Sequence, residues 1–156
     1  MDSHQDAISR LIYAYAEHLD AGNFEAVAAL FEGATFRSNR RTEVRHGAAE
    51  VLDVYRATVA VYDGSPCTKH VITNLVIDVD PTGMVASARS YFTVLQARPE
   101  LPLQSIIAGR YHDRFALTAG WRFSDRLILI DLVGDLRFHL KQSMPERDSG
   151  IGTRDS

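Results

Sequence analysis

The sequence has little of several features that would define a function directly. It contains one cysteine, Cys67, among 156 residues, so no disulfide can form within the chain and no thiolate metal cluster is possible. No apolar run approaches the roughly 20 residues that cross a bilayer, and the N-terminus lacks the basic and apolar regions of a signal peptide. Positive charge is also scarce, with 17 basic against 20 acidic residues and a net charge of −3. We therefore expect a cytoplasmic protein that binds neither membranes nor nucleic acid.

Motifs for phosphate, nucleotide and metal chemistry are missing as well. The chain has no glycine-rich phosphate loop, no GxGxxG, no GxSxG and no HExxH. No two of its six histidines are paired at a four-residue helical spacing, so the sequence predicts neither a metal site nor a cofactor. A basic stretch, RSNRRTEVR (residues 37–45), is short and lies between strand-like segments. We interpret it as a solvated hairpin tip rather than an anion site.

The first part of the chain is predicted to be helical. Apolar residues recur there at intervals of three and four, which indicates helices with one buried stripe each. Gly22 predicts the end of the first helix, and Asn23 is a suitable N-cap for the second. The three predicted helices span residues 6–22, 23–33 and 47–64.

The remainder is rich in β-branched and aromatic residues, as strands are. Turn sequences DPTG, PELP and TAG separate its long runs, and links this short join antiparallel neighbours. The predicted strands span residues 34–39, 42–47, 69–80, 84–98, 105–119 and 121–133. The order predicts an α+β fold, with helices on one face of a curved sheet. We expect one domain over residues 1–143 and a disordered tail over 144–156, where apolar residues almost disappear.

Two polar residues stand on otherwise apolar elements. Asp20 ends the first predicted helix, where the helix dipole disfavours an acid. His70 begins the apolar run HVITNLVIDV. Taken singly, Asp20 fits an outward turn at a helix end and His70 a hydrogen-bonded core or rim residue. Together they are the pair that an oriented general base requires, in which the carboxylate takes the Nδ1 proton, fixes the tautomer and stabilises the imidazolium.

Neighbouring residues suit a small-molecule site. Tyr15, Tyr55 and Tyr91 could supply phenolic donors among apolar walls, although core packing with a tethered hydroxyl is the alternative for each. Asn74 follows His70 by four residues on one predicted strand, and therefore on one face, where it could hold a substrate oxygen. We expect these residues to bind a small, largely apolar substrate.

Two segments carry a resemblance to a known family. LIYAYAEHLDAGNFEAVAALFEGATF resembles the opening of the SnoaL-like polyketide cyclases of the nuclear transport factor 2-like superfamily, and GRYHDRFALTAGWRFSDRLI resembles their closing hairpin. The similarity runs from about Ala7 to Leu140. It implies a cone-shaped, mostly antiparallel sheet around three helices, a cystatin-like α+β barrel with a deep pocket. It also implies a polyketide-like substrate, no cofactor, and a homodimer or higher homo-oligomer.

The resemblance also implies roles for particular residues. Scytalone dehydratase and hexachlorocyclohexane dehydrochlorinase use an Asp–His dyad, and Asp20 and His70 match its two positions. Ketosteroid isomerase has a tyrosine that Tyr15 matches, but the place of its aspartate base, around Ser38, holds no carboxylate here. A scytalone-type site also has a tyrosine where this chain has Leu19. The dyad therefore carries over, and the substrate-specific residues around it do not.

Three functional hypotheses follow. The first is a cofactor-independent lyase, of dehydratase or dehydrohalogenase type, or an isomerase or cyclase, in which His70 takes a carbon-bound proton and Asp20 orients it. The second is a non-catalytic ligand-binding or accessory module of the same fold. The third is an epoxide hydrolase-like relative, to which Arg89, Arg110 or Asp131 would contribute polar groups in one pocket.

Overall fold

The structure is a computed structural model that describes residues 3–146. Its elements are α1 (His4–Asp20), α2 (Phe24–Ala29), β1 (Thr35–Ser38), β2 (Arg41–His46), α3 (Gly47–Thr58), β3 (Thr68–Val79), β4 (Val85–Arg98), β5 (Leu101–Leu117) and β6 (Trp121–Val133). The strands form one sheet in the order β2-β1-β6-β5-β4-β3. β1 is parallel to β6, and the other neighbours are antiparallel. The predicted α+β class and mixed, mostly antiparallel sheet are confirmed, with the sheet curved and open rather than closed into a barrel.

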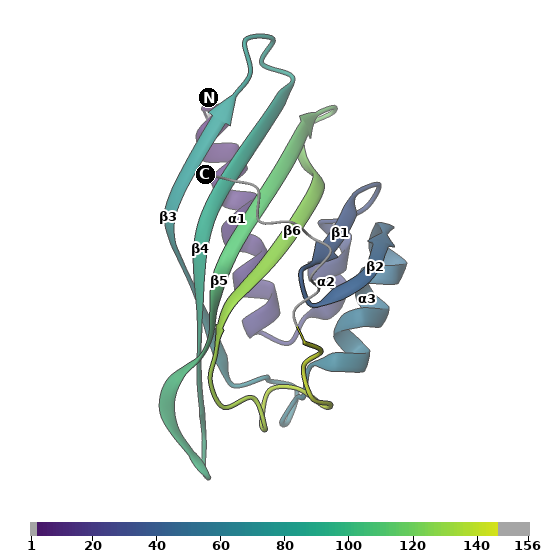
Figure 1. Cartoon of the computed structure of the whole chain (residues 1–156). Coiled ribbons are helices and arrows are strands. Elements are labelled where there is room, and N and C mark those ends of the chain that lie inside the picture. Colours follow the sequence, from purple (N-terminus) through teal and green to yellow (C-terminus); the bar gives the residue numbers. More distant parts are fainter. Residues whose placement is uncertain (1–2, 147–156) are drawn as a thin grey trace.

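Figure 1 shows β3 to β6 as a long twisted sheet with α1 running along one face, while α2 and α3 gather beside β1 and β2. Side chains of β4 alternate between exposed and buried along most of its length, because only one face of the sheet meets the helices. The core and the cavity described below therefore lie between the helices and this inner face. In the described part of the chain, every helix is too short or too polar to cross a membrane.

α1 is fixed at both ends. The Ser3 side chain accepts a hydrogen bond from the Asp6 backbone N–H at 3.0 Å and caps its N-terminus. At the other end Gly22 has a φ of 73°, and a Cβ there would lie 2.1 Å from the carbonyl oxygen of Gly64. Only glycine fits this close approach, which seats the end of α1 against the turn that leads into β3. The buried stripe of α1 consists of Ile8, Ile12, Tyr15, Ala16 and Leu19.

α3 ends earlier than predicted, at Thr58 rather than at residue 64. Val59 is extended instead and forms a β-bridge with Leu140, which comes from the last described segment, residues 134–146. We call this segment the C-terminal strap. The strap also binds the end of α3 through its Lys141 backbone N–H, which donates to the Thr58 carbonyl at 2.9 Å. Because the strap is about 80 residues away from Val59 in sequence, the residues around Val59 do not indicate that the helix ends there.

Two other boundaries differ from the sequence prediction. β5 begins at Leu101 rather than at residue 105, because Leu101 is buried and pairs with Arg98 across a two-residue turn. The sequence predicts a disordered tail from residue 144, yet Met144 and Pro145 both line the cavity. The rest of the predicted tail, residues 147–156, lies outside the described residues.

Candidate active site

A partly open cavity of about 220 Å³ lies between the helices, the inner face of the sheet and the C-terminal strap. Much of its wall is apolar, including Leu19, Phe36, Phe92, Val94, Ile107 and Ile130. An apolar cavity of about 150 Å³ is large enough to hold benzene. The cavity therefore suits a molecule of one or two rings.

Asp20 and His70 are in contact at one side of this cavity. The Nδ1 of His70 lies 2.6 Å from Oδ1 of Asp20, and the backbone N–H of His70 donates to Oδ2 at 2.8 Å. The hydroxyl of Thr68 donates to Oδ1, also at 2.8 Å. Three groups at the start of β3 thus hold the carboxylate and offset its unfavourable position at the C-terminus of α1. The His70 and Asp20 side chains are only 5% and 11% exposed.

These contacts favour the ionised form of Asp20. Burial raises the pKa of Asp20, but its hydrogen bonds to His70 and Thr68 outweigh burial and leave the pKa below its ordinary value. Asp20 is therefore a carboxylate at neutral pH, and the proton in its hydrogen bond belongs to Nδ1 of His70. With Nδ1 directed at Asp20, Nε2 is the remaining ring nitrogen, and it has no hydrogen-bond partner within residues 3–146. His70 lines the cavity, so the pair can offer it a proton acceptor.

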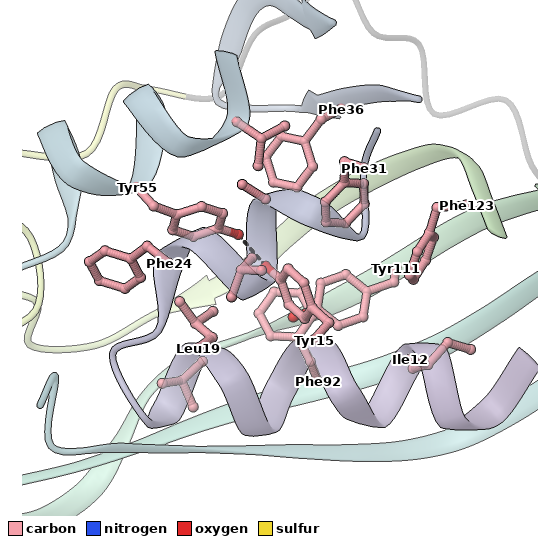
Figure 2. Close-up of a cluster of buried hydrophobic side chains, with 14 of the residues drawn as sticks. Ile12, Tyr15, Leu19, Phe24, Phe31, Phe36, Tyr55, Phe92, Tyr111 and Phe123 are labelled. Carbon is pink, nitrogen blue, oxygen red and sulfur yellow. Dashed lines mark hydrogen bonds between the residues drawn. The ribbon is translucent and has the colours of Figure 1, made fainter. Parts of the chain in front are cut away.

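Three tyrosines form a second polar region of the cavity wall. Tyr15 of α1 and Tyr55 of α3 share a short hydrogen bond between their hydroxyls, which Figure 2 shows as a dashed line. Tyr111 lies edge-on to Tyr15 at 5.7 Å between ring centroids and stacks on Phe92 at 4.4 Å. Burial raises the pKa of all three tyrosines, so they remain neutral phenols. Of the predicted substrate-binding residues, Tyr15 and Tyr55 do line the cavity.

A buried ion pair supports these rings from outside the cavity. Arg126 and Asp113 are fully buried and make two parallel hydrogen bonds of 2.8 Å. The guanidinium lies over the rings of Tyr111 and Tyr15, at 3.8 and 4.3 Å from their centroids. Because a buried bidentate pair has one good geometry, Arg126 holds both rings in position.

The structure does not bring Asn74 or Tyr91 to the cavity. Asn74 has a φ of 53° in a β-bulge, and both it and its neighbour Thr73 are exposed. The inward positions of β3 are 68, 70 and 72 before the bulge and 75, 77 and 79 after it. The prediction that Asn74 shares a face with His70 is therefore wrong. Tyr91 points from the outer face of β4 and is 52% exposed, so its predicted contact with substrate is also wrong.

The polar residues of the epoxide hydrolase-like hypothesis also lie elsewhere. Arg110 and Asp131 form an ion pair of 2.9 Å, each about one third exposed. Neither these two nor Arg89 line the cavity. Among residues 3–146, no three side chains of histidine, cysteine, aspartate or glutamate converge where they could hold a metal ion.

His139 is a cavity residue that the sequence did not indicate. It comes from the C-terminal strap, is 6% exposed, and its Nδ1 is buried without a hydrogen-bond partner among the described residues. Burial, followed by the proximity of His70, lowers the pKa of His139 to about 4. The strap has no apolar period that could have marked this histidine as buried. Arg40 and Arg41 also line the cavity, whereas the sequence predicts a solvated hairpin tip for their basic stretch.

The comparisons with known proteins agree with this arrangement of three helices on one curved sheet with a cavity between them. A family model for the SnoaL-like domain matches residues 3–127. The chain therefore belongs to the SnoaL-like domain family, and the predicted membership is confirmed. A search of curated protein sequences finds no significant match.

Solved structures extend this result to the fold. A candidate scytalone dehydratase from Novosphingobium aromaticivorans has a TM-score of 0.70 and 22% identity, over 95% of this chain and 94% of that one. An NTF2-like protein with a cystatin-like fold from the same organism has a TM-score of 0.67 and 20% identity, over 81% and 80%. ActVI-ORFA from Streptomyces coelicolor has a TM-score of 0.66 and 18% identity, over 80% and 95%. At these identities the likeness shows the NTF2-like fold.

Proposed function

We propose that this protein is a cofactor-independent enzyme in which His70 removes a carbon-bound proton from a small, largely apolar substrate. The observation that carries the proposal is the 2.6 Å hydrogen bond between His70 and Asp20 beside a cavity of about 220 Å³. In this proposal Asp20 orients the imidazole and stabilises the positive charge that it gains. General-base catalysis of this kind contributes roughly 10²- to 10⁴-fold in rate.

The proton transfer runs from the substrate carbon to Nε2 of His70, and the electron pair of the broken C–H bond stays on the substrate. In a lyase that pair forms a double bond and expels a hydroxide or halide from the neighbouring carbon. In an isomerase or cyclase it delocalises onto a carbonyl oxygen before a new bond forms. The neutral hydroxyls of Tyr15 and Tyr55 are suited to hydrogen bond an oxygen that gains negative charge.

Both the family and the apolar wall support the lyase or isomerase class over the epoxide hydrolase-like one. One structural relative is named as a candidate scytalone dehydratase, which is an elimination enzyme. The polar set that water activation would need is not gathered in the cavity, as Arg89, Arg110 and Asp131 lie outside it. A homodimer in the cytoplasm stays a prediction, which analytical ultracentrifugation and cell fractionation would test.

The test is a panel of hydroxylated, halogenated and polyketide-like ring compounds, with product formation followed by mass spectrometry. His70→Ala should lower turnover at least about 10²-fold while its melting temperature still rises with the compounds that stabilise the wild type. His46→Ala is the matched control, because this histidine is exposed and its side chain makes no capping hydrogen bond. Equal, measurable turnover by wild type and His70→Ala would refute the assignment of the base to His70, and binding of these compounds without any turnover by the wild type would favour the non-catalytic binding module.

A further inference from the structure

The charge of the cavity lining is opposite in sign to that of the chain. The chain carries a net charge of −3, yet the lining contributed by residues 3–146 contains two arginines, Arg40 and Arg41, and no aspartate or glutamate. Asp20 is bonded to His70 and is not part of the lining. A low-dielectric cavity strengthens the field of the cations at its rim. The site is therefore electrostatically suited to an anion.

Arg40 and Arg41 differ from the other arginines of their hairpin. Arg37 makes an ion pair of 2.7 Å with Asp125, and Arg45 makes one of 2.6 Å with Glu43. Within residues 3–146, the guanidinium groups of Arg40 and Arg41 have neither an ion pair nor a hydrogen bond. Arg40 is half-buried, and its Nε, like that of Arg45, is shielded from solvent without an acceptor, but Arg45 has Glu43 as an ionic partner and Arg40 has none among the described residues. A shielded donor on a cation is costly to leave unpaired.

The surrounding groups keep these arginines at the opening. The Arg40 backbone N–H donates to the Ser38 hydroxyl at 3.1 Å, which fixes the turn between β1 and β2. Ser38 lines the cavity, as do Gln142 and Ser143 of the C-terminal strap. Arg41, Gln142 and Ser143 are exposed, so this polar part of the lining lies where the cavity meets solvent. The apolar wall lies farther from solvent, among buried residues.

We propose that Arg40, assisted by Arg41, binds a carboxylate of the substrate at the opening of the cavity. The inference rests on the proposed function and narrows its substrate class to carboxylic acids of one or two rings. The ring body would occupy the apolar cavity, and its acidic C–H bond would face His70. A planar guanidinium matches a carboxylate in shape and charge, and it would gain the acceptor that its Nε lacks. The basic stretch is then an anion site rather than a solvated tip.

The test compares 2-naphthoate with 2-naphthamide, which have the same two rings but differ in charge, by isothermal titration calorimetry. The wild type should bind the carboxylate about 10- to 100-fold more tightly, the range for a hydrogen bond to a charged group. Arg40→Met should reduce that preference about tenfold or more. Arg45→Met is the control, because it removes one positive charge from the same hairpin outside the cavity lining. Melting temperatures establish that each variant is folded.

His70→Ala separates this proposal from the catalytic one. It should keep the preference for the carboxylate, since the arginines supply it. Equal affinities for the two probes in the wild type would overturn the anion site and leave the dyad untouched. Loss of the preference in His70→Ala, with retention in Arg40→Met, would also overturn it, because the imidazole would then be the anion's partner. Failure of both probes to bind at millimolar concentration would contradict the two-ring acid class itself.

Discussion

Acidification should destabilise the protein through protonation of His139, at a higher pH than the loss of the contribution from Asp20. The pKa of His139 is about 4 in the folded protein, and an unfolded histidine has a pKa of about 6.5. The unfolded chain therefore binds the proton more tightly, and stability falls as the pH drops from 6.5 towards 4. Between pH 7.5 and 4.5 this linkage amounts to about 2–3 kcal/mol. Asp20, whose folded pKa is lowered, loses its contribution only below about pH 4.

Urea denaturation at pH 7.5, 6.5, 5.5 and 4.5 would measure this linkage. The wild type should lose about 2–3 kcal/mol more over this range than His139→Gln, which cannot take up the proton. His46→Gln should keep the wild-type dependence, because this side chain is exposed. The reasoning is refuted if His139→Gln and the wild type have parallel pH dependences. That result would mean that His139 is as free to protonate in the folded protein as in the unfolded one.

Three further substitutions test what stabilises the fold around the site. Asp113→Asn leaves Arg126 as a buried, uncompensated charge and should lower the free energy of unfolding by about 3–5 kcal/mol in urea titrations. Asp131→Asn breaks an ion pair that is about one third exposed and should cost no more than about 1 kcal/mol by the same measurement. Gly109→Ala would place a Cβ 2.1 Å from a backbone oxygen of β6, so it should destabilise by at least about 1–3 kcal/mol and lower the melting temperature.

The parts of the site that sequence could predict are those with a local signature. Asp20 is an acid at the C-terminal end of α1, and His70 is a polar residue at the start of an apolar strand, so each is unusual for its position. The family resemblance indicated that the two residues act as a pair. Tyr15 and Tyr55 belong to apolar helical stripes, so their inward direction followed from the 3.6-residue period. The α+β class followed from the order of the segments, with helical apolar patterns first and strand-like segments joined by short turns after them.

The predictions that were wrong or missing concern residues whose positions depend on contacts distant in sequence. A strict two-residue alternation places Asn74 with His70, but the bulge at Asn74 inserts a residue and exchanges the two faces. His139 and the early end of α3 both depend on the C-terminal strap, which pairs with Val59 across the fold. Whether Arg40 is solvated depends on the same strap, because residues of the strap line the same cavity. No window of sequence contains such contacts.

The central claim is that His70 takes a proton from carbon, and deuterium incorporation tests it most directly. A compound that the protein turns over or binds in the cavity would be incubated in D₂O, and exchange at the carbon would be followed by NMR. The wild type should exchange that position, and His70→Gln should do so about 10²- to 10⁴-fold more slowly, with Asp20→Asn also impaired. Exchange at the wild-type rate in folded His70→Gln would contradict the account.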